Sequence, residues 1–154
     1  MIGFLGEYEV TMDAKGRFLL PAGFKKQLVE GGSQFVINRG IEVCMSLYPL
    51  QSWEPIFSEV SKLNEFDPKV RQFRRYFLNG ATQLELDSAG RLLIPKSLME
   101  YAGLEKDVVL VSAVDNIEIW DKTNYTKFFE SFTPESYSAL ANEVMNKNDE
   151  KLKS

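Results

Sequence analysis

The chain has 154 residues, of which 44% are hydrophobic and 26% are charged, and its formal net charge is −4. A chain of this length can build one ordinary core or two small cores that depend on each other. The sequence contains no histidine, which is the commonest general base and metal ligand, and its single cysteine cannot form an internal disulfide or a thiolate metal cage. We therefore expect no metal, no cofactor, no small-molecule substrate and no catalytic residues.

The N-terminal residues carry acidic side chains and lack a basic region followed by a long apolar stretch, and no window approaches the ~20 apolar residues of a membrane span. We expect a cytoplasmic protein. Residues 1–77 contain 10 Lys and Arg against 9 Asp and Glu, whereas residues 78–154 contain 8 against 13. Because nucleic-acid binding needs only a local basic surface, the overall acidity does not exclude it.

The first predicted element is a β-hairpin over residues 7–21. Its first half alternates polar and apolar side chains, "DAKG" is typical of a turn, and "RFLLP" is typical of a return strand. In such a turn the Asp13 carboxylate can accept the N–H two residues on, and Gly16 can adopt the positive φ that the turn needs. A short helix is predicted over 21–30, with Pro21 in its first turn, where a missing N–H costs nothing.

The following residues predict a second pair of strands and then two helices. The strands cover residues 34–38 and 42–48 and turn at Arg39. The helices cover residues 51–66 and 68–80.

The same order of elements then occurs a second time, so the sequence contains an internal repeat. A shift of 74 residues pairs Asp13 with Asp87, Gly16 with Gly90, Arg17 with Arg91 and Pro21 with Pro95. The second copy predicts a hairpin over 82–95, a helix over 95–103 and strands over 108–114 and 117–120, followed by helices over 123–132 and 134–147 and a frayed polar tail over 148–154.

A copy of about 50 residues, made of strands and one short helix, buries little surface alone. We therefore expect the two copies, residues 1–77 and 78–154, to fold together. The predicted fold class is α+β, mainly β, with both copies in one pseudo-twofold barrel flanked by helices.

Arg17 and Arg91 follow the turn glycines, at a place where turn geometry has no need for arginine. Each could pair with the aspartate of its own turn as a weak surface contact. Alternatively, the hairpin tips could present a guanidinium fork to a phosphate or a base edge. Lys15 adds a cation to the first turn, whereas its counterpart is Ala89, so the first turn is predicted to be the stronger DNA contact.

Four stretches together resemble the MraZ family, whose members contain two copies of the SpoVT/AbrB swapped-hairpin motif. They are "EYEVTMDAKGRFLLPAGF", "FVINRGIEVCMSLYPLQSWE", "FRRYFLNGATQLELDSAGRLLIPKSLMEYAGL" and "VVLVSAVDNIEIWD". The resemblance implies a swapped-hairpin barrel, a ring-like homo-oligomer and a bacterial, nucleoid-associated transcriptional regulator. It also implies that the regulator binds direct repeats in double-stranded DNA upstream of the division and cell-wall gene cluster. Val10 departs from the family pattern, which often has histidine there.

The candidate DNA-binding residues are Lys15, Arg17, Arg91, Lys25 and Arg39. Lys25 stands at a position that is commonly basic in the family, and Arg39 stands at the second turn of the first copy. A protein-interaction or antitoxin-like module of the same fold, working through residues 133–154, is the alternative. A hydrolase is disfavoured because the sequence has neither histidine nor a Gly-rich phosphate loop.

Overall fold

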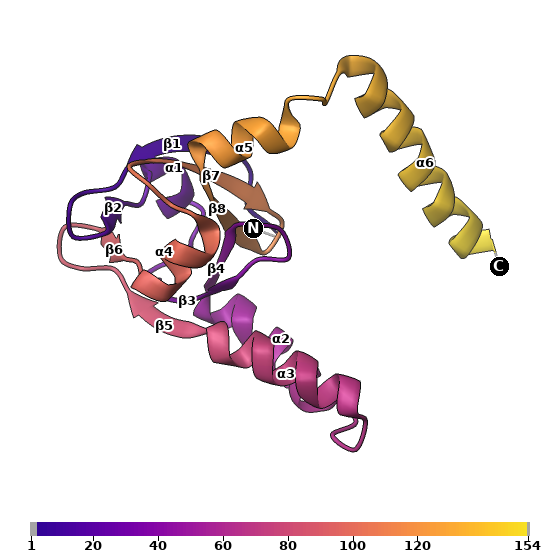
Figure 1. Cartoon of the computed structure of the whole chain (residues 1–154), viewed down its shortest axis with the longest axis horizontal. Coiled ribbons are helices and arrows are strands. Elements are labelled where there is room, and N and C mark those ends of the chain that lie inside the picture. Colours follow the sequence, from indigo (N-terminus) through magenta and orange to yellow (C-terminus); the bar gives the residue numbers. More distant parts are fainter. Residues whose placement is uncertain (1–2, 154) are drawn as a thin grey trace. The chain divides into compact units, whose positions relative to one another are not determined.

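A computed structural model describes the backbone of residues 3–153 and the side chains of residues 3–147. The chain divides into two compact units, Met1–Asn124 and Tyr125–Ser154. In chain order the elements are β1 (Glu7–Thr11), β2 (Arg17–Leu19), α1 (Ala22–Lys25), β3 (Gln34–Arg39), β4 (Met45–Pro49), α2 (Leu50–Ser61), α3 (Pro68–Gly80), β5 (Thr82–Glu85), β6 (Arg91–Leu93), α4 (Lys96–Ala102), β7 (Asp107–Ala113), β8 (Asn116–Asp121), α5 (Lys122–Phe129) and α6 (Pro134–Lys153) (Figure 1).

The first unit is an α+β fold built on antiparallel strands. Six strands form one sheet in the order β1-β7-β8-β4-β3-β5, and β2 and β6 form a separate two-stranded ribbon. The described strands therefore form an open sheet and a ribbon, and do not close into the one pseudo-twofold barrel that we expected. The edge strands β1 and β5 do not pair with each other, so the sheet stays open. The strands that follow them in the chain, β2 and β6, leave the sheet and form the ribbon.

The predicted first hairpin also needs correction. The turn after β1 forms, but β1 does not pair with β2. Instead β1 pairs with β7, from Glu7 opposite Val111 to Thr11 opposite Asp107, and β2 pairs with β6. In the same way β5 pairs with β3. Each copy thus gives both of its first two strands to partners in the other copy, whereas the second pairs, β3 with β4 and β7 with β8, form within a copy as predicted.

The strand order is unchanged when the two copies are exchanged. Exchange maps β1 on β5, β7 on β3 and β8 on β4, so the sheet order reads the same from either edge. Equivalent residues meet at the centre. Phe18 lies opposite Leu92 in the ribbon, and Ser46 lies opposite Glu118 in the sheet, where a two-residue deletion in the second copy changes the shift from 74 to 72. The two copies are therefore related by an approximate internal twofold axis that passes through the ribbon and the middle of the sheet.

The short helices α1 and α4 begin one residue later than predicted. Pro21 and Pro95 have extended backbone, with ψ of 142° and 137°, and so stand at the N-cap positions. Their carbonyls accept the first helical hydrogen bonds, which for Pro21 come from the N–H groups of Phe24 and Lys25. Since α1 ends at Lys25, it is also shorter than predicted.

Both copies contribute to one hydrophobic core. Its fully buried large side chains include Phe18, Phe24, Phe35, Ile37, Leu47, Leu92, Leu110, Ile117 and Ile119. Outside that cluster, Trp53 of α2 stacks on Phe77 of α3 with ring centroids 5.5 Å apart. The sharing of one core explains how two copies that are each too small can fold.

The second unit contains the end of α5 and the helix α6. Near its start Phe132 makes edge-to-face contacts with Phe129 and Tyr137, at centroid distances of 6.0 and 5.9 Å. The backbone of α6 continues past residue 147 to Lys153, through the segment predicted to be a frayed tail. None of the helices described between residues 3 and 153 has the length and apolar character needed to cross a bilayer.

Candidate nucleic-acid interface

The turn after β1 is held by one carboxylate. Asp13 Oδ1 accepts hydrogen bonds from the backbone N–H groups of Lys15 and Arg17, both at 2.9 Å, and Oδ2 accepts one from Arg17 Nε at 2.8 Å. Gly16 adopts a φ of +85°, the left-handed conformation that favours glycine. In this turn the carboxylate accepts the N–H two residues on, the glycine has a positive φ, and the arginine also takes part in the network.

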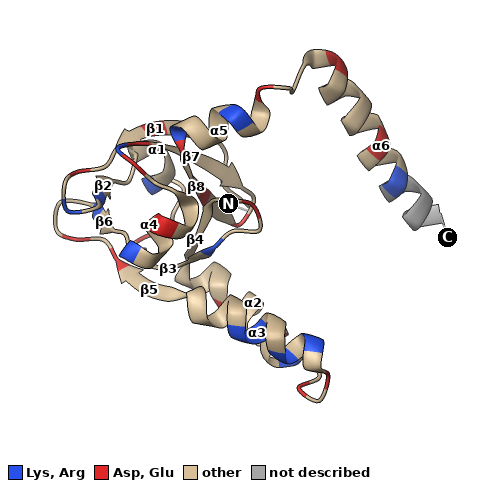
Figure 2. Ribbon diagram, in the orientation of Figure 1, with Lys and Arg blue, Asp and Glu red and all other residues tan. Residues whose placement is uncertain are grey.

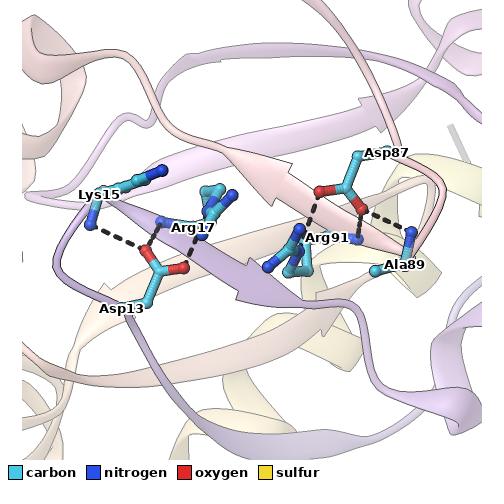
Figure 3. A network of polar contacts seen from close by, with 6 residues as sticks. All are labelled: Asp13, Lys15, Arg17, Asp87, Ala89 and Arg91. Carbon is cyan, nitrogen blue, oxygen red and sulfur yellow. Dashed lines mark hydrogen bonds and ion pairs between the residues drawn. The ribbon is translucent and has the colours of Figure 1, made fainter.

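The second copy repeats this arrangement bond for bond. Asp87 Oδ1 accepts from the N–H groups of Ala89 and Arg91 at 2.9 Å, and Oδ2 accepts from Arg91 Nε at 2.9 Å. Gly90 has a φ of +81°. Figure 3 shows the two networks facing each other, with the arginine side chains between them on neighbouring strands. We call Asp13–Arg17 and Asp87–Arg91 the twin turns.

The hydrogen bonds of the twin turns keep their aspartates ionised. Donation by the backbone N–H of Arg17 lowers the pKa of Asp13 below its ordinary value of 3.8, and the Arg17 guanidinium contributes in the same direction. The backbone N–H of Arg91 lowers the pKa of Asp87 in the same way. Each arginine therefore has a charged partner that fixes where its guanidinium lies.

The ribbon that joins the twin turns has one buried face and one exposed face. Phe18 and Leu92 point into the core. Because side chains alternate along a strand, the opposite face carries the residues before and after each of them. That outer face consists of two half-buried arginines and two exposed leucines, namely Arg17, Arg91, Leu19 and Leu93.

Two lysines accompany the twin turns. Lys15 lies in the first turn, and its side chain is exposed. Lys25, from α1 of the first copy, lies at the second turn, where a Cβ added to Gly90 would stand 3.2 Å from the lysine Nζ. The structure thus brings four of the five predicted DNA-binding residues together, namely Lys15, Arg17, Arg91 and Lys25.

Arg39, the fifth candidate, has contacts of a different kind. Its Nη1 donates to the carbonyl of Tyr76 in α3 at 2.7 Å, and its guanidinium carbon lies 4.2 Å from the centre of the Tyr76 ring. The same guanidinium carbon lies 6.0 Å from the centre of the Tyr101 ring of α4. Arg39 therefore links the end of β3 to two helices, and it remains a DNA-binding candidate separate from the twin turns.

A second basic area lies along α3. Figure 2 shows lysine and arginine on this helix as well as near the start of β2 and β6. Arg71, Arg74 and Arg75 occupy α3, and Arg71 Nη1 donates to the carbonyl of Glu65 at 2.9 Å. The helical spacing predicted this basic face.

Sequence reasoning missed two features of the site. The placement of Lys25 at the second turn depends on the crossing of the chains, and no local pattern signals it. The exposed leucines beside the arginines could have been recognised, because in "GRFLLP" and "GRLLIP" residues two apart share a face. In the part of the chain that the structure describes, no three or more His, Cys, Asp and Glu residues are grouped to hold a metal ion.

The fold and the site define a class of protein: an α+β chain of two exchanged repeats that presents a pair of arginine-bearing turns on one ribbon. Comparison with known families agrees with this description. The family described as "MraZ protein, putative antitoxin-like" matches the chain twice, over residues 3–76 and 77–148. The chain belongs to the MraZ family.

Several curated relatives carry the name Transcriptional regulator MraZ. The protein of Christiangramia forsetii is 42% identical over 97% of this chain and 97% of its own length. That of Cytophaga hutchinsonii is 48% identical over 81% of this chain and 83% of its own. That of Flavobacterium psychrophilum is 43% identical over 95% and 94%.

Proposed function

We propose that the chain is a sequence-specific, DNA-binding transcriptional regulator and that the twin turns contact double-stranded DNA. The observation that carries this proposal is the presence of two Asp–Arg turns with the same hydrogen bonds, whose arginines both lie on the outer face of one ribbon. A two-stranded ribbon is a size that the major groove admits. The names of the curated relatives support the regulatory role.

The ion pair inside each turn is compatible with DNA contact. The aspartate takes the Nε–H of the arginine, which is one of five N–H donors on a guanidinium, and the two terminal nitrogens carry the other four. These can reach a phosphate or the O6 and N7 atoms of guanine in a bidentate manner. Because the aspartate already holds the side chain, less rotational freedom is lost on binding.

The finer features follow the same proposal. We propose that residues 1–77 and 78–154 are two SpoVT/AbrB-type repeats and that the exchange of β1, β2, β5 and β6 between them is the swapped-hairpin arrangement. The two matched ranges and the crossed strand pairing support this. We also propose a ring-like homo-oligomer in the cytoplasm, at the nucleoid, that binds direct repeats upstream of the division and cell-wall gene cluster.

The test is a titration of the full chain with a duplex taken from upstream of its own gene and with a random duplex of equal length, at two salt concentrations. Arg17→Ala and Arg91→Ala are compared with Lys62→Ala, which removes an exposed cation beyond α2. An arginine that reads guanine should cost about 1–3 kcal/mol per contact on the upstream duplex alone. An arginine that touches phosphate should weaken both duplexes and reduce the salt slope by about one per contact.

Two results would overturn the proposal. One is a parent protein that binds the upstream and random duplexes equally at both salt concentrations. The other is a pair of arginine variants that bind as well as the parent while keeping its melting temperature and particle mass. Lys62→Ala should bind as the parent does, since its cation lies outside the twin turns.

A protein-interaction or antitoxin-like role is the second candidate. The exposed apolar side chains of α6, Tyr137, Leu140 and Val144, recur at the spacing of one helical face. The description of the family as antitoxin-like also favours this candidate. A parent protein that fails to prefer its upstream duplex but binds another protein through α6 would support it.

A further inference from the structure

We infer that Lys25 contacts a DNA phosphate at the second turn, so that the two turns contribute equally to DNA binding. This inference rests on the proposed function of the twin turns. In the sequence the two turns differ by one cation, because Lys15 of the first turn corresponds to Ala89 of the second. The folded chain removes that difference by placing a lysine of the first copy on the turn of the second.

The geometry is a crossed exchange between the copies. A Cβ added to Gly90 in the second turn would lie 3.2 Å from Lys25 Nζ of the first copy. A Cβ added to Gly16 in the first turn would lie 3.1 Å from Met99 Cε of the second copy. Lys25 and Met99 are equivalent residues under the shift of 74. The same place over each turn is thus filled by a cation at one turn and by an apolar thioether at the other.

Backbone hydrogen bonds fix these two positions. The N–H of Leu20 donates to the carbonyl of Gly90 at 3.1 Å, and the N–H of Ile94 donates to the carbonyl of Gly16 at 2.9 Å. Five residues further along the chain come Lys25, which is the last residue of α1, and Met99, which lies in the middle of α4. The position of Lys25 over the second turn therefore follows from the crossing of the strands.

The consequence is a balance of charge. The first turn contains the Lys15 and Arg17 cations and the Asp13 carboxylate, and it has Met99 over its glycine. The second turn contains the Arg91 cation and the Asp87 carboxylate, and it receives the ammonium of Lys25. Each turn thus has two cations against one carboxylate. The expectation that the first turn binds DNA more strongly was based on local sequence, and this arrangement argues for equal shares.

The chemistry of lysine indicates which part of DNA Lys25 contacts. An ammonium is a compact, strongly hydrated charge that binds phosphate without the fixed fork of arginine. Contacts of this kind add affinity on every sequence and release condensed counterions, so their effect depends on salt. Lys25 should therefore contribute to affinity and salt dependence, while the arginines beside it contribute to base recognition.

The experiment uses the full chain with three changes. Lys25→Met installs the residue that stands at the equivalent place in the other copy. Lys26→Met is the matched control, because Lys26 is the exposed neighbour of Lys25 and lines a different hollow, together with Gly3 and Asp115. The double variant Lys25→Met with Ala89→Lys moves the lysine from the helix into the second turn.

Each protein is titrated at 50 and 200 mM salt with the upstream duplex and the random duplex, after its melting temperature and particle mass are checked. Lys25→Met should weaken binding to both duplexes and reduce the salt slope by about one per contact. A fourfold rise in salt would then weaken the parent about threefold more than the variant for each lost contact. The double variant should recover the parent's slope, and Lys26→Met should match the parent throughout.

The result that overturns this inference is a Lys25→Met protein with the affinity and salt slope of the parent while Arg17→Ala and Arg91→Ala are impaired. A Lys25→Met protein that is weakened but not rescued by Ala89→Lys also contradicts it, because the lysine would then act somewhere other than the turn. If neither the arginine variants nor Lys25→Met affects binding, the proposed function of the twin turns fails instead. The outcomes of the two proposals are therefore distinguishable.

Discussion

Phe18 lies directly opposite Leu92 in the β2–β6 ribbon, and the two side chains, from different repeats, are 1% and 0% exposed. They are equivalent residues that meet at the internal twofold axis. Neither can be buried unless the other repeat is folded, so this pair links the stability of one copy to that of the other.

The first prediction concerns this pair. Phe18→Ala removes a fully buried ring from the shared core and should lower the free energy of unfolding by about 3–5 kcal/mol. Leu19→Ala is the control, because the neighbouring leucine is exposed on the outer face of the ribbon and should change stability by only about 0.5 kcal/mol. Both values come from chemical denaturation of the full chain. Equal losses for the two variants would contradict the assignment of the faces.

The second prediction is that half of the chain does not fold alone. A fragment of residues 1–77 lacks β7 and β6, which are the partners of β1 and β2. It should show no cooperative thermal transition by circular dichroism, whereas mixing it with residues 78–154 should restore one. A cooperative transition from the 1–77 fragment by itself would contradict the exchange of strands.

These features show what could be predicted from the sequence. The positions of Asp13 and Gly16 define the turn because their roles are local: a carboxylate accepts an N–H two residues on, and a glycine adopts a positive φ. The strands that begin the two copies were located for the same reason, since alternation is a property of each segment, whereas β4 begins at Met45 and not at residue 42 as predicted. Alternation does not identify a strand's partner, which is why the β1–β2 hairpin was predicted and the pairing with β7 was not.

The candidate site divides in the same way. The recurrence of Arg17 as Arg91 was sufficient to select the arginines, and the structure places them side by side. Lys25 belongs to the first copy in the sequence, and its position beside the second turn was not predicted, although its amino group lies over Gly90 of the second copy. That position depends on the long-range hydrogen bond from Leu20 to Gly90, which no short window of sequence contains.

The third prediction concerns pH. The pKa values of Asp13 and Asp87 are lowered in the folded chain, so the stabilisation from their hydrogen bonds is present above the unfolded value near 3.8 and is lost as the pH falls through the lower folded values. The amide proton shifts of Lys15 and Ala89, whose N–H groups donate to these carboxylates, should titrate with midpoints below 3.8. The amide of Gly32, which donates to the carbonyl of Val29, is the control. Midpoints above 3.8 would contradict the turn geometry.

The fourth prediction tests the proposed homo-oligomer through α6. Leu140 and Val144 are 47% and 49% exposed and lie one turn apart on the same side of the helix as Tyr137, so a second copy of the chain could bury this face. Leu140→Glu with Val144→Glu would place charges in such an interface and should lower the particle mass measured by light scattering at micromolar concentration.

Asn142→Glu is the control, because it introduces a carboxylate on the opposite side of α6 and should leave the mass unchanged. Fewer subunits also mean fewer twin turns on one particle, and linked binding sites raise overall affinity without any new contact. The double variant should therefore lose affinity for a duplex with several repeats more than for a duplex with one. A monomeric parent would contradict the homo-oligomer itself, whereas an oligomeric parent whose mass survives both substitutions would show that copies associate through a surface other than α6.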